Sequence, residues 1–185
     1  GRVRLTMRDA ATRDTLAGAV FALYTDTGAR VYAAGTAGSY RYSPTSGNAL
    51  FAVNSAGVLE ITDLPYGSYY FTEITAPSGY ALSTERLAFS VLTDESLVEV
   101  TMLNSRVLGA ARLRKVSLDG GAPLAGAVFE LYARTPSSLT SAIASTIYRG
   151  AYYRVGTYTT DATGSIYVGD LPWDDYYFVE VTAPA

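Results

Sequence analysis

The feature that most constrains this 185-residue chain is that its sequence contains the same blocks twice. Residues 16–24 read LAGAVFALY and recur 108 positions later as LAGAVFELY at residues 124–132. The block at residues 63–65 recurs at residues 170–172, 107 positions later. Because both the order and the spacing are kept, the sequence predicts two copies of one domain.

The repeats place the domain boundary after residue 106. Residues 1–106 form the first predicted domain, with an insertion at residues 25–55 that is rich in Gly, Ser, Thr and Tyr. Residues 107–185 form the second, joined through a short linker at residues 107–111. The first copy continues for 28 residues (106 − 78 = 28) beyond Ser78, the equivalent of Ala185. The second copy is therefore expected to lack its last strands.

A further repeated stretch combines aromatic and β-branched residues with one carboxylate: YYFTEITAPS at residues 69–78 and YYFVEVTAPA at residues 176–185. This composition favours a strand, and alternation places every second side chain on the same face. A Glu sharing a face with Tyr and Phe is costly unless it is neutral, paired or exposed. The residues predicted to share a face are Tyr69, Phe71 and Glu73 in the first copy and Tyr176, Phe178 and Glu180 in the second.

Short alternating segments separated by Gly, Pro, Asn and Asp recur along both copies, and no helical period is sustained. This pattern predicts an all-β fold of two tandem β-sandwiches. Residues 35–47 are expected to form a loop, and residues 86–92 and 97–103 to form a closing hairpin. The first strand of the second copy is expected at residues 112–117.

The composition excludes several functional classes. The chain has no Cys and no His, which excludes disulfides, Cys/His metal sites and His-based catalytic triads, and no cofactor is predicted. The net charge of −3 is spread over both copies, with −2 (8 − 10) in residues 1–106 and −1 (6 − 7) in residues 107–185. Without a basic patch a nucleic-acid partner is not expected. No apolar run is long enough to span a membrane.

Taken together, these blocks resemble the B-type repeat domains of the collagen adhesin family, also called SpaA-like or prealbumin-like domains of Gram-positive surface proteins and pilins. The resemblance covers nearly all of both copies except the variable middles. The sequences that carry it are KVS at residues 115–117, PLAGAVFELY at 123–132, TG at 163–164, DLP at 170–172 and the stretch at 176–184.

The resemblance implies an intramolecular isopeptide bond, in which a first-strand Lys joins a last-strand Asn or Asp beside a buried Glu. The first copy matches the family at Glu73 and Asn104, but Met7 stands at the lysine position. Methionine cannot react, and Arg8 cannot substitute because a guanidinium stays protonated. We expect no isopeptide bond in the first copy.

The second copy has the converse set. It contains Lys115, the only lysine of the chain, and Glu180, but no Asn at all. Its acceptor must therefore come from outside these 185 residues, either from neighbouring domains of the same protein or from another subunit that supplies the missing strands. An open sheet edge invites such strand addition.

Simpler interpretations remain beside these. Lys115 is also consistent with an exposed strand lysine, Glu73 with a carboxylate that bonds a Tyr hydroxyl, and Asn104 with a turn residue. Trp173 is read either as a cap or as an exposed contact. The tyrosines of the variable middles are read either as a glycan- or protein-binding surface or as packing over a sheet edge. They are Tyr32, Tyr40, Tyr42, Tyr148, Tyr152, Tyr153 and Tyr158.

The resemblance implies a stalk or fibre module of a secreted, cell-wall-associated adhesin or pilin, and not a turnover enzyme. The alternative is an adhesin tip that binds a host protein or glycan through the insertions at residues 25–55 and 134–160.

Overall fold

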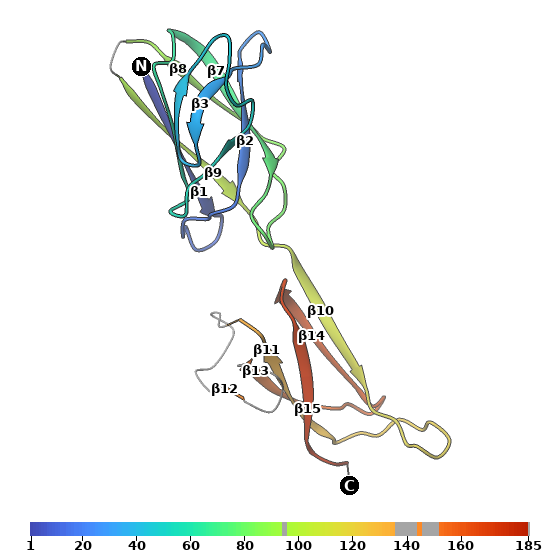
Figure 1. The fold of residues 1–185 in the computed structure, drawn as a ribbon. Coiled ribbons are helices and arrows are strands. Elements are labelled where there is room, and N and C mark those ends of the chain that lie inside the picture. Colours follow the sequence, from blue (N-terminus) through green and yellow to red (C-terminus); the bar gives the residue numbers. More distant parts are fainter. Residues whose placement is uncertain (94–95, 136–143, 146–151, 185) are drawn as a thin grey trace. The chain divides into compact units, whose positions relative to one another are not determined.

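The computed structural model describes residues 1–93, 96–135, 144–145 and 152–184. The chain divides into two compact units, Gly1–Val107 and Leu108–Ala185 (Figure 1). All regular secondary structure of the described residues is β-strand, and none of them lies in a helix that could cross a membrane. The prediction of an all-β fold is confirmed.

The first unit is a sandwich of two sheets. One sheet has the strand order β3-β4-β6-β1-β9 and the other β5-β2-β7-β8. The strands are β1 (Arg2–Asp9), β2 (Val20–Thr25), β3 (Ala33–Thr36), β4 (Ser39–Tyr42), β5 (Phe51–Ala52), β6 (Val58–Thr62), β7 (Gly67–Thr75), β8 (Arg86–Val91) and β9 (Leu97–Asn104).

The core between these sheets is built by alternation. In β1 the residues Val3, Leu5 and Met7 are fully buried, while their neighbours are partly or fully exposed. From the facing sheet, Phe21 and Phe71 meet edge to face with ring centroids 6.1 Å apart. Such aromatic pairs add stabilisation beyond the area that they bury.

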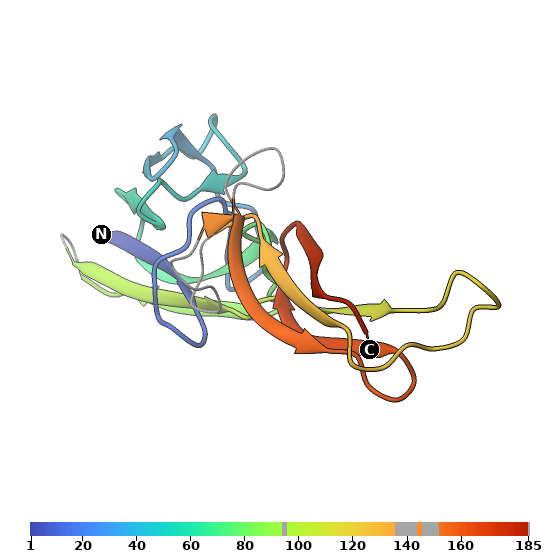
Figure 2. The ribbon, with the colours of Figure 1, turned by 90° about the horizontal axis from the view of Figure 1, so that it is seen from below.

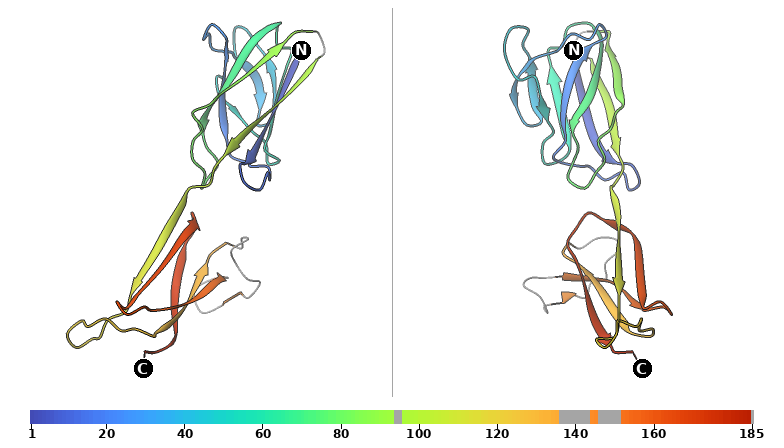
Figure 3. Two further views of the ribbon diagram at one scale, coloured as in Figure 1. Left: turned by 180° about the vertical axis from the view of Figure 1, so that it is seen from behind. Right: turned by 90° about the vertical axis from the view of Figure 1, so that its right-hand side faces the viewer.

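The first and last strands of this unit are parallel neighbours. β1 and β9 pair in continuous register over eight residues, from Arg2 opposite Leu97 to Asp9 opposite Asn104. Figure 3 shows the two strands side by side, β1 in dark blue and β9 in yellow-green. The ladder therefore brings Asn104 to the end of the strand that carries Met7.

Two expectations for the first unit are wrong. β8 and β9 do not form a hairpin, because β8 pairs with β7 in one sheet and β9 with β1 in the other. The expected loop at residues 35–47 contains the hairpin of β3 and β4. Gly35 and Gly38 have positive φ angles of 148° and 85°, which lets this polar, glycine-rich segment turn tightly between two short strands.

The second unit repeats part of this design. Its sheets have the orders β10-β14 and β12-β13-β11-β15, and the curved pair of β11 and β13 appears in amber and orange in Figure 2. The strands are β10 (Leu108–Arg114), β11 (Val128–Ala133), β12 (Ala144–Ser145), β13 (Tyr152–Thr159), β14 (Ser165–Pro172) and β15 (Tyr176–Thr182). Among the described residues of this unit, no strand takes the places that β8 and β9 have in the first.

Two expected boundaries in the second unit are also wrong. The expected linker at residues 107–111 is mostly strand, because β10 begins at Leu108. β10 ends at Arg114, so Lys115 follows the strand instead of lying within it. Met7 and Lys115 make equivalent backbone hydrogen bonds, Met7 with Gly57 and Leu16 and Lys115 with Gly164 and Leu124. Met7 lies within a strand because it also pairs with Met102 of β9, whereas the pairing of β1 with β6 stops at Thr6. Within the described residues, β10 pairs only with β14 and ends where that ladder ends.

Equivalent details nevertheless recur in the two units. The Tyr69 hydroxyl donates to the Pro65 carbonyl at 2.9 Å, and the Tyr176 hydroxyl donates to the Pro172 carbonyl at 2.8 Å. Both bonds fix the turn that leads into the Glu-bearing strand. The duplication read from the sequence is thus a duplication of side-chain contacts as well.

Candidate functional site

Glu73 is placed in the interior of the first unit by β7. The ladder of β2 and β7 has a bulge next to Phe21, after which Phe21 lies opposite Glu73. Bulges re-aim the side chains beside them. Tyr69, Phe71 and Glu73 are 6%, 0% and 5% exposed, so the predicted inward face is confirmed, carboxylate included.

Asn104, the last residue of β9, is the direct partner of Glu73. Its side-chain Nδ2 donates to both Glu73 oxygens at 2.8 Å, and the Ser83 backbone N–H donates to Oε2 at 2.7 Å. Asn104 is only 1% exposed, and its Oδ1 is a buried acceptor without a hydrogen-bond partner. The alternative readings are wrong on this point: Asn104 is a buried strand residue, and Glu73 is bonded by an amide and a backbone N–H instead of a Tyr hydroxyl.

The buried environment controls the protonation of Glu73. Burial raises the pKa of its carboxyl, while hydrogen bonds from the Ser83 N–H and the Asn104 amide act in the opposite direction. Desolvation disfavours the charged form of an acid, so a net upward shift means that burial dominates here. Glu73 is thus biased towards its neutral, proton-donating form.

Met7 occupies the position equivalent to Lys115 of the second unit, since the two residues make equivalent backbone hydrogen bonds. It is fully buried in β1, opposite Met102 of β9 and two residues before the pair of Asp9 and Asn104. The first unit therefore brings together Glu73 and Asn104 in the interior, with a thioether on the neighbouring strand instead of an amine.

The second unit pairs the other two predicted residues. Lys115 Nζ lies 2.9 Å from Glu180 Oε2, and the two side chains are 29% and 32% exposed. Glu180 lies opposite Phe129 after the same bulge that sets Glu73 opposite Phe21. The expectation of a buried Glu180 is nevertheless wrong, because no described strand covers β15 as β8 and β9 cover β7.

Comparison with known protein families decides the identity of both units. The profile of the SpaA prealbumin-like fold domain matches residues 1–106 and again residues 109–185. The chain belongs to the SpaA prealbumin-like family. The first unit is hereafter the first SpaA domain and the second unit the second SpaA domain.

Two solved structures are similar to this chain over its whole length. The Bacillus anthracis TIE protein is 23% identical with a TM-score of 0.73, and the match covers 100% of this chain and 29% of that one. A streptococcal ancillary pilin is 26% identical with a TM-score of 0.51, covering 100% of this chain and 54% of that one. This chain thus spans about a third to a half of those proteins. No curated protein matches it.

The first SpaA domain also contains a buried charge cluster that the sequence did not reveal. Asp9 is 1% exposed, and its Oδ2 accepts from Arg106 Nε at 2.7 Å and from the Tyr80 hydroxyl at 2.8 Å. Its Oδ1 accepts from the backbone N–H groups of Ala11 and Thr12 at 2.7 and 3.0 Å. The only sequence signal was an Asp at the end of an alternating strand, since Tyr80 and Arg106 lie 71 and 97 residues away.

These contacts outweigh the cost of burying Asp9. Burial alone raises the pKa of this carboxyl, but the hydrogen bonds from Thr12, Arg106, Tyr80 and Ala11 together bring the pKa far below its ordinary value. A carboxylate with several donors stays ionised. Asp9 is therefore a charged clamp that ties the end of β1 to the residues just after β9.

The tyrosines of the variable middles divide between core and surface. In the first SpaA domain Tyr40 is 6% exposed and Tyr42 packs on the core, while Tyr32 is 41% exposed. In the second, Tyr158 packs on the core, and Tyr152 meets Tyr177 edge to face at 4.6 Å. Tyr148 lies outside the described residues, as do residues 136–143 of that insertion. Trp173 is 74% exposed, so the cap interpretation is wrong.

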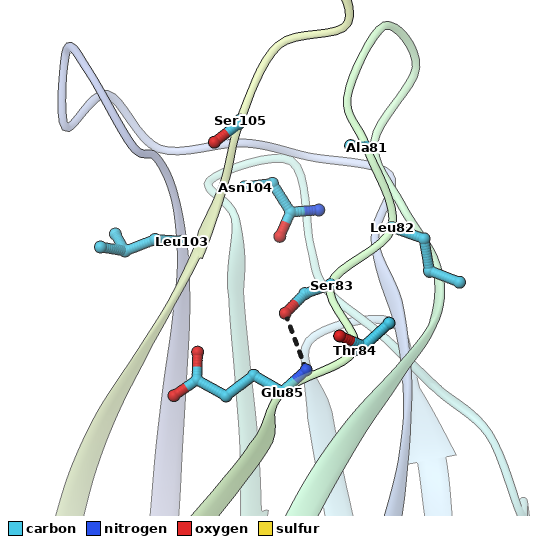
Figure 4. A pocket seen from close by; sticks show the side chains of 8 residues that line it. All are labelled: Ala81, Leu82, Ser83, Thr84, Glu85, Leu103, Asn104 and Ser105. Carbon is cyan, nitrogen blue, oxygen red and sulfur yellow. Dashed lines mark hydrogen bonds between the residues drawn. The ribbon is translucent and has the colours of Figure 1, made fainter.

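A cavity of about 350 Å³ opens beside Asn104 in the first SpaA domain. Its walls are the segment 81–85, which precedes β8, and residues 103–105 at the end of β9 (Figure 4). Within the described part of the chain, no group of three or more His, Cys, Asp or Glu side chains is placed to hold a metal ion.

Proposed function

We propose that this chain is a structural stalk or fibre module of a Gram-positive surface adhesin or pilin, located outside the cell in association with the wall. Two consecutive SpaA domains and the likeness to a streptococcal ancillary pilin over the full chain support this role. The proposed function is mechanical and involves no catalytic turnover.

The observation that carries the proposal is the pairing of the terminal strands in the first SpaA domain. Tension enters at the start of β1 and leaves at the end of β9. Since these strands are parallel and adjacent over eight residue pairs, their entry and exit points lie at opposite ends of one ladder. A pull along them loads the whole ladder in shear, so its hydrogen bonds share the force instead of opening one after another.

The first SpaA domain is proposed to carry this load without a covalent lock. Met7 supplies no amine, and the Asp9 clamp joins the strand ends by charge-assisted hydrogen bonds, which are stronger than neutral ones. We expect the intact mass of residues 1–106 to equal the sequence mass. A loss of one ammonia, about 17 Da for amide formation by an amine nucleophile, would contradict this.

The second SpaA domain is proposed to receive strands from outside these 185 residues, by continuation of the same protein or from another subunit. Two observations support this: Lys115 and Glu180 are already paired, and β10 and β15 each have one described neighbour in their sheets. Family-type isopeptide chemistry is then open to Lys115 once an Asn or Asp arrives on a strand parallel to β10.

A peptide of residues 97–106 tests this chemistry, because that segment holds Asn104 in parallel register with β1. Incubated with the chain, it is expected to give an adduct at Lys115 with loss of one ammonia. The matched peptide with Asn104→Ala should give none. A second SpaA domain that resists limited proteolysis with no added strand would overturn the proposal.

The competing function is an adhesin tip that binds host protein or glycan through the tyrosines of the insertions. Three of these tyrosines, Tyr40, Tyr42 and Tyr158, pack on the cores, which leaves fewer aromatic groups for a ligand. Glycan arrays and collagen-binding assays separate the two functions. A stalk is expected to bind nothing in them and to show high resistance in single-molecule pulling, whereas saturable binding favours the tip.

A further inference from the structure

The outward face of β1 in the first SpaA domain contains an arginine that is held between two carboxylates. Arg4 Nη2 donates to Glu60 Oε2 of β6 at 2.9 Å, and its Nη1 donates to Glu99 Oε1 of β9 at 3.4 Å. The ladders explain these contacts, because Arg4 lies opposite Glu60 on one side and opposite Glu99 on the other. Both neighbouring strands thus supply an acid to the same guanidinium.

Arg112 has the equivalent place in the second SpaA domain, but its neighbour there is not an acid. β10 and β14 pair in the same register as β1 and β6. Arg112 therefore lies opposite Tyr167, which has the place of Glu60. The guanidinium of Arg112 lies over the Tyr167 ring, 5.9 Å from its centroid. Among the described residues, no strand lies beside β10 in the place that β9 has beside β1.

A second arginine on the same face increases the unbalanced charge. Arg112 and Arg114 are two positions apart on β10, so both side chains lie on its outward face, and both are exposed. The residue equivalent to Arg114 in the first domain is the neutral Thr6. None of the ion pairs between described residues includes Arg112 or Arg114. β10 therefore presents two positive charges to any strand that pairs with its free side.

The inward face of the same strand requires apolar neighbours. Ala111 and Leu113 alternate with the two arginines and pack on the core of the second domain. In the first domain β9 meets the equivalent requirement with Val98 and Val100, which pack on the core on either side of the exposed Glu99. A strand that fits β10 must therefore alternate apolar residues with residues that complement a positive charge.

We propose that Arg112 and Arg114 select the strand that completes the second SpaA domain, by pairing with acidic residues at alternate positions of that strand. This inference rests on the proposed function, in which β10 receives a parallel strand from outside these 185 residues. The first domain fills the same place from its own polypeptide with β9, so we assign the selected segment to the same protein. By the register of β9, the two acidic positions are those of Glu99 and Thr101.

Peptides based on residues 97–106 test the selection, because this segment holds the required parallel register in the first domain. Asn104→Ala is present in all of them, so that no amide bond with Lys115 can form and binding stays reversible. The acidic peptide has Glu99 and Thr101→Glu, and its neutral control has Glu99→Gln and Thr101→Gln. Fluorescence anisotropy of the labelled peptides measures binding to the full chain, and hydrogen exchange of the β10 amides locates it.

The acidic peptide is expected to bind about fivefold more tightly than the neutral one at low ionic strength, since two exposed ion pairs each contribute modestly. Added salt should reduce this ratio by screening the charges. The double variant Arg112→Gln and Arg114→Gln should bind both peptides equally. The matched control is Arg86→Gln, which removes an exposed arginine that lies over a tyrosine ring in the first domain, and it should keep the ratio of the wild type.

The outcomes separate this inference from the function on which it rests. Equal affinity of the two peptides for the wild-type chain would overturn the charge selection and leave strand addition at β10 intact. Failure of both peptides to protect the β10 amides would overturn the strand addition itself, and the selection with it. A segment of the same protein acts at an effective concentration on the order of 1 mM, so micromolar affinity suffices. Nanomolar affinity would instead assign the strand to a separate subunit and overturn its assignment to the same protein.

Discussion

The two SpaA domains divide one set of chemical groups between them. The first has Glu73 and Asn104 in contact at 2.8 Å and a methionine where an amine would stand. The second has Lys115 and Glu180 in contact at 2.9 Å and no asparagine anywhere in its sequence. Each domain therefore contains two of three groups, and the missing group differs.

The comparison also shows that the position of a side chain depends on its own strand, whereas its burial depends on the neighbouring strands. Glu73 and Glu180 occupy equivalent places after the same bulge, opposite Phe21 and Phe129. Glu73 is 5% exposed, because β8 and β9 close the sandwich around it, whereas the Glu180 side chain is 32% exposed. Similar local sequences thus yield a buried acid with a raised pKa in one domain and an ion pair about a third exposed in the other.

The strongest test of this comparison supplies the missing amine to the first domain. Met7→Lys places a lysine on β1 next to the buried pair of Glu73 and Asn104. We expect an isopeptide bond, seen as a mass loss of about 17 Da, because burial favours the neutral amine and the neutral acid. A cross-link that closes a loop of about 97 residues (104 − 7) stabilises by about 4 to 5 kcal/mol in the chain-entropy account of disulfides.

The control for this variant removes the acceptor. Met7→Lys combined with Asn104→Ala should keep the sequence mass and unfold more readily than the wild type, since it buries an unreacted lysine. An unchanged mass in Met7→Lys alone would show that position 7 is not equivalent to position 115 in space, and the comparison would lose its basis.

A second test removes the charge by which the first domain ties its strand ends. Asp9→Asn keeps the shape of the side chain but leaves Arg106 and Tyr80 without a buried carboxylate. Breaking a buried ion pair costs about 3 to 5 kcal/mol, and the partial exposure of Arg106 reduces this to about 2 to 3 kcal/mol. Hydrogen exchange of the β1 and β9 amides measures the loss. Asp14→Asn, an exposed change in the same loop, should have almost no effect.

The sequence predicted where strands form and which side chains share a face better than it predicted which strands pair with each other. Alternation correctly placed Tyr69, Phe71 and Glu73 on an inward face, because that pattern depends on one strand alone. It did not show that β8 and β9 join different sheets, since the pattern does not specify the neighbouring strand. The Asp9 cluster was missed for the same reason: its donors come from residues 71 and 97 positions away. Exposure of Glu180 likewise depends on strands beyond its own.

A third test uses pH, where the two buried acids of the first domain act with opposite sign. The pKa of Glu73 is raised by burial, so its native form binds protons more tightly than the unfolded chain does. Its contribution is full below the unfolded pKa of about 4.3 and is lost as pH rises through the folded pKa. Asp9 has a lowered pKa, so its contribution is present above about 3.9 and is lost as pH falls.

Glu73→Gln isolates the first of these two contributions. In the wild type the free energy of unfolding is expected to decrease as the pH rises above about 4.3, because the folded state binds more protons than the unfolded state. A glutamine does not titrate, so this decrease should be absent in the variant. Urea unfolding is measured at a series of pH values, with hydrogen exchange of the β7 amides as the probe, and the free energy of unfolding plotted against pH gives this slope. Identical slopes in the variant and the wild type would mean that folding does not raise the pKa of Glu73.

The smallest effect is expected where the second domain has its own pair. Lys115→Met converts it to the residue found at position 7 and removes the contact with Glu180. Both side chains are about a third exposed, and ion pairs with such access to water contribute less than about 1 kcal/mol. Hydrogen exchange of the β11 and β15 amides measures the change in this domain alone. A loss of several kcal/mol in Lys115→Met would mean that the ion pair is already shielded from water without added strands, which would contradict the proposal that this domain is completed by strands from outside.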